Sequence, residues 1–371
     1  MSEDRPVVIT GRGVLSSLGC DWASFAAAVR AGAEASTSGD PFPGAMPEDP
    51  VPYFPLSDPE ALKQSSAGRD SEPLAALASA AGREALTEAG IPLNGAPLDD
   101  VGLVMNTVFG PSAAVEVYLE RLREGGPRTA RPSFFVDTLM SMPASRLGIA
   151  LRLRGSTAVL AGSSAFELAL DWVRTGREHT VVAGGGEYQS PKCLRHYRTL
   201  VERSGSERSL LAQGAAFAVL EAADHAEERG AKRLATVLGA GAASEAQDVA
   251  LPWSADPEGH ALVCAMRAAL TDARVEPEAV HAVVLAAGDD TAEGGELAAL
   301  RTVFAGHAES LTLVRPKRLL GEALGASAGL SLLAALASLD GEAAAGPPLA
   351  VVNAFEMGGA ITSLVLEVAS S

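Results

Sequence analysis

The feature that most constrains the fold is a pattern that occurs twice in the chain. Residues 85–107 read ALTEAGIPLNGAPLDDVGLVMNT, and residues 269–288 read ALTDARVEPEAVHAVVLAAG. Each segment combines a helix end, an acidic turn that contains proline, and an apolar strand. Such a repeat indicates a duplicated α/β architecture. We place the junction in the charged segment 222–232, which predicts an N-terminal half of residues 1–225 and a C-terminal half of residues 226–371.

Short Val-rich runs alternate with longer stretches that are rich in Ala and Leu. Residues 6–14 predict a buried strand, and residues 21–31 predict a helix. This alternation predicts a mostly parallel sheet that helices cover on both faces. The stretch that follows, up to about residue 72, is rich in Pro, Gly, Ser and acidic residues, so we expect a surface excursion there.

Charge and cysteine content exclude several classes of function. The formal net charge is −17, and a surface of this sign repels nucleic acid and anionic membranes. Cys20, Cys193 and Cys264 are widely spaced without a CxxC pair, so we expect no disulfide framework, no zinc site and no cofactor. A strand-like VVIT begins at residue 7, and no apolar run reaches the ~20 residues of a membrane span. We therefore expect a cytoplasmic protein.

Three segments, in this order, resemble the β-ketoacyl synthase family. They are residues 7–19 (VVITGRGVLSSLG), residues 214–241 (GAAFAVLEAADHAEERGAKRLATVLGAG) and residues 353–368 (NAFEMGGAITSLVLEV). They are similar to that family's first strand and loop, its crossover between halves, and its closing Gly-rich loop with the last strand. The resemblance spans nearly the whole chain. It implies a thiolase-like, five-layered αβαβα fold made of two duplicated halves.

The chemistry of that family needs a cysteine thiolate at a helix N-terminus, where the helix dipole and nearby donors lower the thiol pKa. The motif resembles residues 156–165, STAVLAGSSA, in which Val159 occupies the cysteine position. Valine cannot form a thioester. The alternative interpretation is an ordinary strand–turn–helix unit unrelated to an acyl site. Ser163, Ser164 and Cys193 are other nucleophile candidates by residue type only, and serines at a helix N-terminus usually act as caps.

Two histidines complete the family's site, where they help to decarboxylate the extender and stabilise an oxyanion. Their motifs resemble residues 285–306 and 316–330, in which Ala287 and Glu322 occupy the histidine positions. Alanine has no polar group, and a glutamate opposes an oxyanion, so we expect no catalytic residue in this chain. Lys317 is kept, and we expect it to form a charge pair with Glu322. The six histidines of the chain fall on no recognisable motif.

The combined losses favour a chain length factor, the family's subunit that pairs with an active ketosynthase as a heterodimer. Loading-type decarboxylating ketosynthases also lose the cysteine, but they keep both histidines. Aromatic pathways commonly carry glutamine at the cysteine position, so Val159 favours a reducing, polyene-type system. Because carrier proteins are acidic, we expect the carrier to bind mainly through the partner. A divergent acyltransferase with a relocated nucleophile and a non-enzymatic scaffold stay open as alternatives.

The resemblance also indicates which residues line the acyl tunnel. Phe109 matches the gate position of the acyl pocket, and Met357 falls where the family has its gating phenylalanine. Phe134, Phe135 and Met140 are bulky apolar residues in the segment that crosses the dimer interface. The alternative for all five is ordinary hydrophobic core, which overlaps with the first interpretation because obligate interfaces resemble a core.

Overall fold

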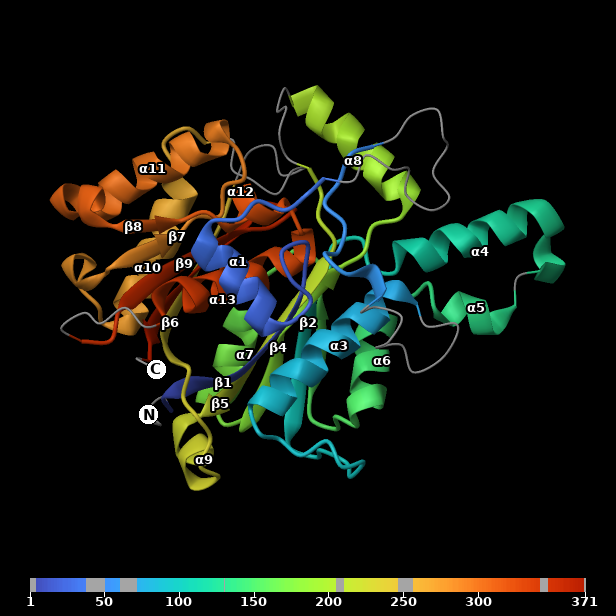
Figure 1. Ribbon diagram of the computed structural model, residues 1–371, viewed down its shortest axis with the longest axis horizontal. Helices are drawn as coiled ribbons and strands as arrows, with labels where there is room; N and C mark the ends of the chain where they lie inside the picture. Colours follow the sequence, from blue (N-terminus) through green and yellow to red (C-terminus); the bar gives the residue numbers. More distant parts are fainter. Residues whose placement is uncertain are drawn as a thin grey trace.

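A computed structural model of the protein describes residues 5–37, 51–60, 72–129, 131–204, 210–245, 256–340 and 346–369 (Figure 1). Ten strands in these ranges form a sheet in the order β3-β2-β4-β5-β1-β6-β10-β9-β7-β8. The first five strands along the chain are β1 (Val7–Leu15), β2 (Val101–Asn106), β3 (Thr157–Leu160), β4 (Thr180–Glu187) and β5 (Gly214–Ala222). The second five are β6 (Ala235–Ser244), β7 (Ala282–Val284), β8 (Thr312–Val314), β9 (Leu349–Phe355) and β10 (Ala360–Val368).

The strand order confirms the predicted duplication. The order β3-β2-β4-β5-β1 in the first half corresponds to β8-β7-β9-β10-β6 in the second, and the halves meet where β1 pairs antiparallel with β6. In each half the outer two pairs are parallel and the inner two are antiparallel. The position of the junction at residue 225 stays a prediction.

The sheet is mixed, so the prediction of a mostly parallel sheet was wrong. The physical reason is visible at β9 and β10, which a turn of only four residues joins. Such a short connection is possible only between antiparallel strands, because parallel strands need a crossover of a dozen or more residues. The apolar runs of the sequence indicate buried strands, but they do not indicate the direction of the neighbouring strand.

Helices complete the five layers. They are α1 (Trp22–Ala31), α3 (Pro73–Glu88), α4 (Ser112–Gly125), α5 (Pro132–Val136), α6 (Met142–Leu151), α7 (Ala165–Arg174), α8 (Pro191–Ser204), α9 (Ala223–Glu228), α10 (His260–Ala273), α11 (Asp290–Phe304), α12 (Pro316–Leu320) and α13 (Ser327–Leu339). Helices α3 and α6 cover the outer face of the first half-sheet, and α10, with α11 beside it, covers that of the second. Helices α7 and α13 lie between the half-sheets. Because α13 is enclosed on all sides, it is apolar around its whole circumference.

The stretch after α1 is only partly described. Residues 38–50 and 61–71 of the predicted surface excursion lie outside the described residues. Between them, Tyr53 and Leu56 are buried, and the backbone of Phe54 bonds to Leu211 and Gln213. This part of the stretch is therefore not a surface excursion. The prediction followed from the Pro- and Gly-rich residues on either side. Their composition dominates the sequence pattern, so the two buried apolar side chains between them were not recognised.

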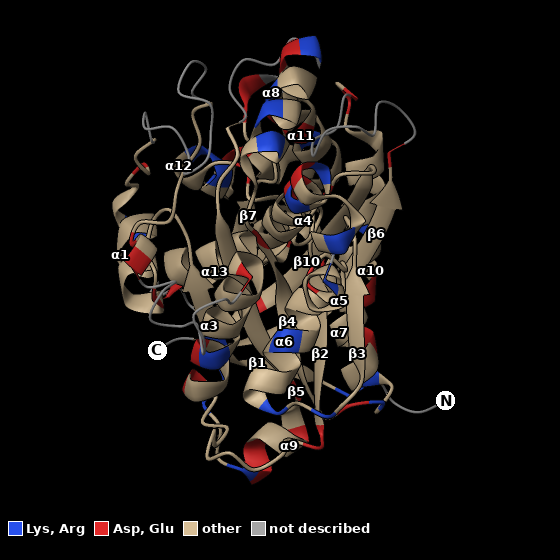
Figure 2. Ribbon diagram, turned by 90° about the vertical axis from the view of Figure 1, so that its right-hand side faces the viewer, with Lys and Arg blue, Asp and Glu red and all other residues tan. Residues whose placement is uncertain are grey.

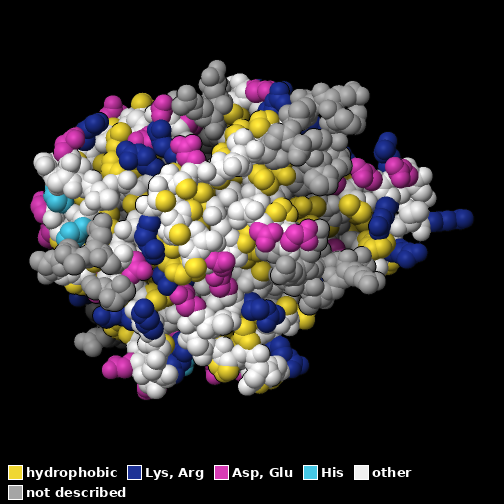
Figure 3. All heavy atoms as spheres, in the orientation of Figure 1, with side chains coloured by type: hydrophobic (Ala, Val, Ile, Leu, Met, Phe, Trp, Pro, Cys, Tyr) yellow, Lys and Arg dark blue, Asp and Glu magenta, His cyan; other side chains and the backbone are white. Residues whose placement is uncertain are grey.

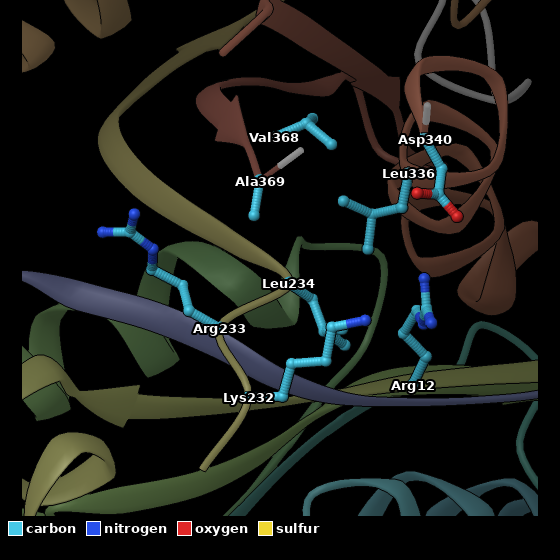
Figure 4. Close-up of a pocket in the computed structure, with 8 residues that line it drawn as sticks. All are labelled: Arg12, Lys232, Arg233, Leu234, Leu336, Asp340, Val368 and Ala369. Atoms are coloured by element: carbon cyan, nitrogen blue, oxygen red, sulfur yellow. The ribbon is translucent and has the colours of Figure 1, made fainter. Parts of the chain in front are cut away.

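A small pocket marks the junction of the two halves (Figure 4). It is lined by residues from β1, the segment before β6, α13 and the end of β10, including Arg12, Leu234, Leu336 and Val368. The Arg12 guanidinium is already paired with Glu88: Arg12 Nη2 donates to Glu88 Oε1 at 2.6 Å. The pocket therefore lies where the halves pack together and is remote from the ends of the strands that form the site below.

Charged side chains of both signs are distributed over the surface. On the face seen in Figure 3, acidic and basic side chains of the described residues are interspersed rather than gathered in one patch. Figure 1 shows α4 and α5 projecting from the body on the side away from α10 and α11. Within the described ranges, no helix has the length and apolar character needed to cross a membrane.

Candidate functional site

Buried polar side chains from both halves meet at one end of the sheet. Asn106 ends β2, Glu187 ends β4, and Glu356 follows β9, while Lys317 lies in α12 and Glu322 comes shortly after it. All five are buried, and Glu187 is 0% exposed. Together with Glu296 of α11, we call these residues the polar cluster. Such a concentration of acids in a protein interior is costly unless hydrogen bonds and cations compensate it.

Lys317 and Glu322 form the ion pair that the sequence predicted. Lys317 Nζ lies 2.6 Å from Glu322 Oε2, with both side chains almost fully buried. Glu322 Oε1 accepts hydrogen bonds from Leu324 N and Ser327 Oγ, both at 2.7 Å. The carboxylate at the second histidine position is therefore fixed on both oxygens, and it neutralises the lysine that the family motif retains.

Ala287, at the first histidine position, contributes only its backbone. Its N–H donates to Glu296 Oε2 at 2.9 Å, while Ala286 N and Asn353 Nδ2 donate to Glu296 Oε1 at 3.0 Å each. Burial raises the pKa of Glu296, and these donors together with the charge of Lys317 counteract the rise. Glu296 thus holds the strand end in place, and the Ala287 methyl group offers no proton donor.

Asn106 connects the cluster to the N-terminus of α7. Its Oδ1 accepts from Gly162 N at 3.1 Å and Ser163 N at 3.4 Å, and its Nδ2 donates to Glu356 Oε2 at 3.2 Å. Burial raises the pKa of Glu356 to about 8, although the nearby charge of Lys317 lowers it in part. The helix terminus where the family's chemistry takes place is therefore occupied by an amide and a largely protonated acid.

Val159 does not lie in the polar cluster. It belongs to β3, where it pairs with Met105, and it packs against the core between the first half-sheet and helices α3 and α6. Side chains alternate between the two faces of a strand, so Leu160, opposite Asn106, faces the central layer instead. The structure thus brings Lys317, Glu322 and Ala287 together, and it places Val159 on the other face of the sheet.

The turn before α7 leaves no room for a nucleophile at its tightest point. Helix α7 begins at Ala165, three residues after Gly162. Gly162 has φ +71°, and a Cβ atom added there would collide with the carbonyl oxygen of Met357. A side chain at this position is therefore excluded both by backbone conformation and by space.

The remaining nucleophile candidates lack activation. Ser164 Oγ is buried and has no hydrogen-bond partner within the described ranges, and a serine nucleophile needs an adjacent base. Burial raises the pKa of the Cys193 thiol, which disfavours the thiolate. All six histidines, His179, His196, His225, His260, His281 and His307, are exposed or half-buried, and their hydrogen bonds lie outside the polar cluster.

Phe109 and Met357 lie together beside the polar cluster. Both are half-buried and pack against a hydrophobic group that includes Leu324 and the inner side of α8, where Leu194 and Tyr197 are buried. We call this group the gate cluster. The structure therefore unites the two residues to which the sequence assigned gating positions, although 248 positions of sequence separate them.

The other three predicted tunnel residues lie on the projecting segment. Phe134 is half-buried beneath Arg121, whose guanidinium carbon is 4.1 Å from the ring centroid. Phe135 is 50% exposed and Met140 is 40% exposed. The Met140 sulfur lies against Gly110, next to the gate. Thus Phe134 is half-buried and Phe135 is exposed on α5, whereas Met140 lies against the loop that carries Phe109.

Sequence reasoning missed Asn106, Glu187 and Glu356 as parts of the site. Each is a polar residue that closes an apolar or Gly-rich strand, in GLVMN, VAGGGE and NAFE respectively. A carboxylate or amide at the end of a buried strand is a signal that could have identified them. Nothing in the sequence pairs Asn106 with Glu356, which lies 250 residues away.

Comparison with known proteins supports the assignment of the fold. Residues 4–223 match the β-ketoacyl synthase N-terminal domain, and residues 234–348 match the C-terminal domain. The chain belongs to the β-ketoacyl synthase family. Nodulation protein E of Rhizobium leguminosarum bv. trifolii is 30% identical, over 91% of this chain and 86% of that protein. The 3-oxoacyl-[acyl-carrier-protein] synthase 2 of Staphylococcus aureus (strain N315) is 26% identical, over 93% and 88% respectively.

Among solved structures, the ishigamide ketosynthase/chain length factor is similar to this member of the β-ketoacyl synthase family. The TM-score is 0.83 with 22% sequence identity, and the match covers 99% of this chain and 100% of that one. This likeness shows the thiolase-like fold.

Proposed function

We propose that this chain is a non-catalytic chain length factor. It pairs with an active ketosynthase and shapes the tunnel that sets the length of a polyketide or polyene chain. The observation that carries the proposal is the buried ion pair of Lys317 with Glu322 at the second histidine position. Ala287 at the first histidine position and the bare turn at Gly162 agree with it.

The electrostatics of the polar cluster oppose condensation chemistry. That chemistry develops negative charge on an oxyanion, which preorganised donors must stabilise. Here the one buried lysine among the described residues of the cluster is already paired with Glu322, and Glu356 lies close enough for their charges to interact. An oxyanion in this site would face carboxylates rather than imidazole donors.

One face of the molecule fits the predicted ketosynthase partner. β3 is the last strand of the sheet in the described ranges, so its outer edge is available for pairing. Next to it lies an open groove of about 380 Å³ between α6 and β3, where Ile149 is 75% exposed. Phe135, Val136, Leu139 and Met140 add exposed apolar surface, and Figure 2 shows this face with α4, α5, α6 and β3 toward the viewer.

Such a face indicates a large, obligate contact. Contiguous apolar surface beside an open strand edge is rare on monomers and typical of protein interfaces. The ishigamide ketosynthase/chain length factor, by its printed name, combines the two kinds of subunit that we propose for this complex. With a net charge of −17 on this chain, the acidic carrier binds mainly through the active partner.

A length assay tests the function directly. In the complex with its ketosynthase, Phe109→Ala should shift products toward longer chains, because a packed phenyl ring cannot yield to another two-carbon unit. Phe109→Leu should give an intermediate shift. Gel filtration of each complex must first show intact assembly, since the truncation costs roughly 3–5 kcal/mol if the ring is fully packed. An unchanged length distribution in intact complexes would remove Phe109 from the gate.

Two measurements separate the alternatives. An acyltransferase with a relocated nucleophile forms a stable covalent adduct on this chain alone, which intact mass spectrometry after incubation with malonyl- or acyl-carrier detects. A scaffold forms no stable 1:1 complex on co-expression with a ketosynthase. We expect no adduct and a stable 1:1 complex, with the isolated chain poorly soluble or self-associated. A well-behaved monomer at micromolar concentration would count against the pairing face.

A further inference from the structure

We infer that Glu187 is the positioning residue of the gate: its buried carboxylate fixes the loop that carries Phe109, and thereby the depth that a growing chain can reach. The inference rests on the proposed function, because it assigns a role within the same tunnel. It concerns a residue at the end of β4 that forms no part of the family's cysteine and histidine motifs as they fall on this sequence.

The hydrogen bonds of Glu187 hold residues 107–110 of the loop between β2 and α4, which we call the gate loop. Oε2 accepts from Val108 N at 2.8 Å and from Thr107 Oγ1 at 3.3 Å, and Oε1 accepts from Phe109 N at 3.0 Å. Thr107 Oγ1 in turn accepts from Gly110 N at 3.2 Å. Residues 107–110 are therefore all tied to this carboxylate, either directly or through the threonine hydroxyl.

The same carboxylate also fixes the loop to the opposite wall. Gly325 N, in the short helix Leu324–Ala326, donates to Glu187 Oε2 at 3.4 Å. Leu324 is buried in the gate cluster against which Phe109 packs. Glu187 is thus the point at which β4, the Phe109 loop and the wall of the gate are joined.

Among the residues that the structure describes, Glu187 has these donors and forms no ion pair. It is 0% exposed, and its hydrogen bonds come from backbone N–H groups and one hydroxyl. Burial raises its pKa to about 7, and the same four donors lower it in part. A buried carboxylate without a salt bridge contributes little to stability. Its geometric effect is strong, because two fixed oxygens determine the directions of several N–H groups at once.

Glu187→Gln changes one contact selectively. The amide oxygen can replace Oε2 and keep the bonds to Val108, Thr107 and Gly325. The amide nitrogen then faces Phe109 N–H, and two donors cannot bond to each other. The variant therefore releases the backbone of Phe109 while the side chain keeps its size. We expect the ratio of longer to parental products to rise by roughly three- to tenfold, the range that the loss of one such bond implies.

A double-mutant cycle tests whether Glu187 acts through Phe109. The product lengths of the assembled complex are compared for the parent, Glu187→Gln, Phe109→Ala and the double variant. If Glu187 only positions the ring, Glu187→Gln should add nothing once the ring is absent. Glu221→Gln is the matched control, since Glu221 is also 0% exposed and hydrogen-bonded, but lies on β5 opposite Thr180, at the start of β4. It should lower the melting temperature without moving product length.

Each outcome has a defined meaning. Non-additive length shifts support the inference. Additive shifts, or a Glu221→Gln variant that moves length equally, overturn it. A shift with Phe109→Ala but none with Glu187→Gln overturns the positioning role and leaves the proposed function intact. No shift with either removes Phe109 from the gate and overturns the inference with it, while the proposed function is tested separately by the adduct and co-expression measurements. If Glu187→Gln fails to assemble, Thr107→Val loosens the same loop more gently, and an unchanged length distribution with that variant would also overturn the inference.

Discussion

A buried carboxylate lies at each end of β4, and the two are compensated in opposite ways. At its start, Thr180 and Thr10 donate to Glu221, and Arg229 adds a bidentate ion pair at 2.8 and 2.5 Å. At its end, the donors to Glu187 within the described part of the chain are backbone N–H groups and one hydroxyl. The pKa of Glu221 is lowered: burial raises it, but the bonds to Arg229 and Thr10 outweigh that effect. The pKa of Glu187 is raised to about 7, because burial prevails.

The contrast separates a structural end of the molecule from the end that carries the candidate site. The network around Glu221 connects β1, β4, β5 and the segment after α9, where Arg229 Nη1 also reaches the Ala89 carbonyl at 2.7 Å. There, Arg229 balances the charge of Glu221, and the ion pair stabilises the fold. At the other end, four glutamates gather around one lysine, which costs stability. Proteins accept such a cost where a site requires a particular geometry.

Removing the cation that is paired with Glu221 should have the largest effect of any single substitution on the free energy of unfolding. Arg229→Leu leaves Glu221 buried without its cation, and we expect the free energy of unfolding to fall by about 3–5 kcal/mol. Urea unfolding followed by tryptophan fluorescence measures it. Arg123→Leu is the control, because the Arg123–Glu124 pair is largely exposed and should contribute less than about 1 kcal/mol. Equal effects of the two substitutions would contradict the distinction between the two ends.

Raising the pH should lower the free energy of unfolding through the buried carboxyl groups at the Glu187 end of β4. Burial raises the pKa of Glu356 to about 8 and of Glu187 to about 7, from an ordinary value of 4.5. The native state therefore keeps protons that the unfolded chain releases. This contribution is fully present below pH 4.5 and is lost as the pH rises through 7 and 8. Glu72, the N-cap of α3, acts in the same direction, because burial raises its pKa to about 7.

We expect the free energy of unfolding to fall by several kcal/mol between pH 5 and pH 8, of which Glu356 alone accounts for roughly 3–4 kcal/mol. Glu356→Gln should flatten this profile and stabilise the protein at pH 8, since the amide never ionises. Glu221, whose lowered pKa contributes stability above pH 4.5, should leave the slope in this window unchanged when replaced by glutamine. Unfolding curves at several pH values give both slopes. A profile as steep in Glu356→Gln as in the parent would assign the pH dependence elsewhere.

The smallest effect should come from Val159→Cys. Val159 faces α3 and α6, away from the polar cluster, so the change alters stability by less than about 1.5 kcal/mol. It should also create no condensing activity, because Ala287 and Glu322 remain. Elongation of an acyl carrier by the variant alone, read by mass spectrometry, would show that the thiol reaches the site and that histidines are dispensable.

The sequence predicted what depends on local spacing. The repeated segments and the three family-like segments led to the duplicated five-layered fold. Lys317 and Glu322 stand five positions apart in one family-like motif, which led to the prediction of their pair. It could not fix the face of β3 on which Val159 lies. A strand alternates its side chains with a period of two, so an uncertainty of one residue reverses the assignment.

The rest of the site depends on contacts that no local pattern encodes. The bonds from Asn106 to Glu356 and from Gly325 to Glu187 join segments more than a hundred residues apart. These contacts exist because both halves of the chain bring the ends of their strands to one place. Predicting them requires the packing of the half-sheets and not only the existence of the strands.

Under the proposed pairing with a ketosynthase, the open edge of β3 also has a consequence for how much of this subunit a cell can maintain. A chain released without its companion presents a bare strand beside Ile149 and the exposed apolar residues of α5. Chaperones and proteases act on such surfaces, so unassembled copies should be removed while assembled ones persist. We expect the abundance of the subunit to follow the supply of its companion, and their synthesis to be balanced at equal numbers.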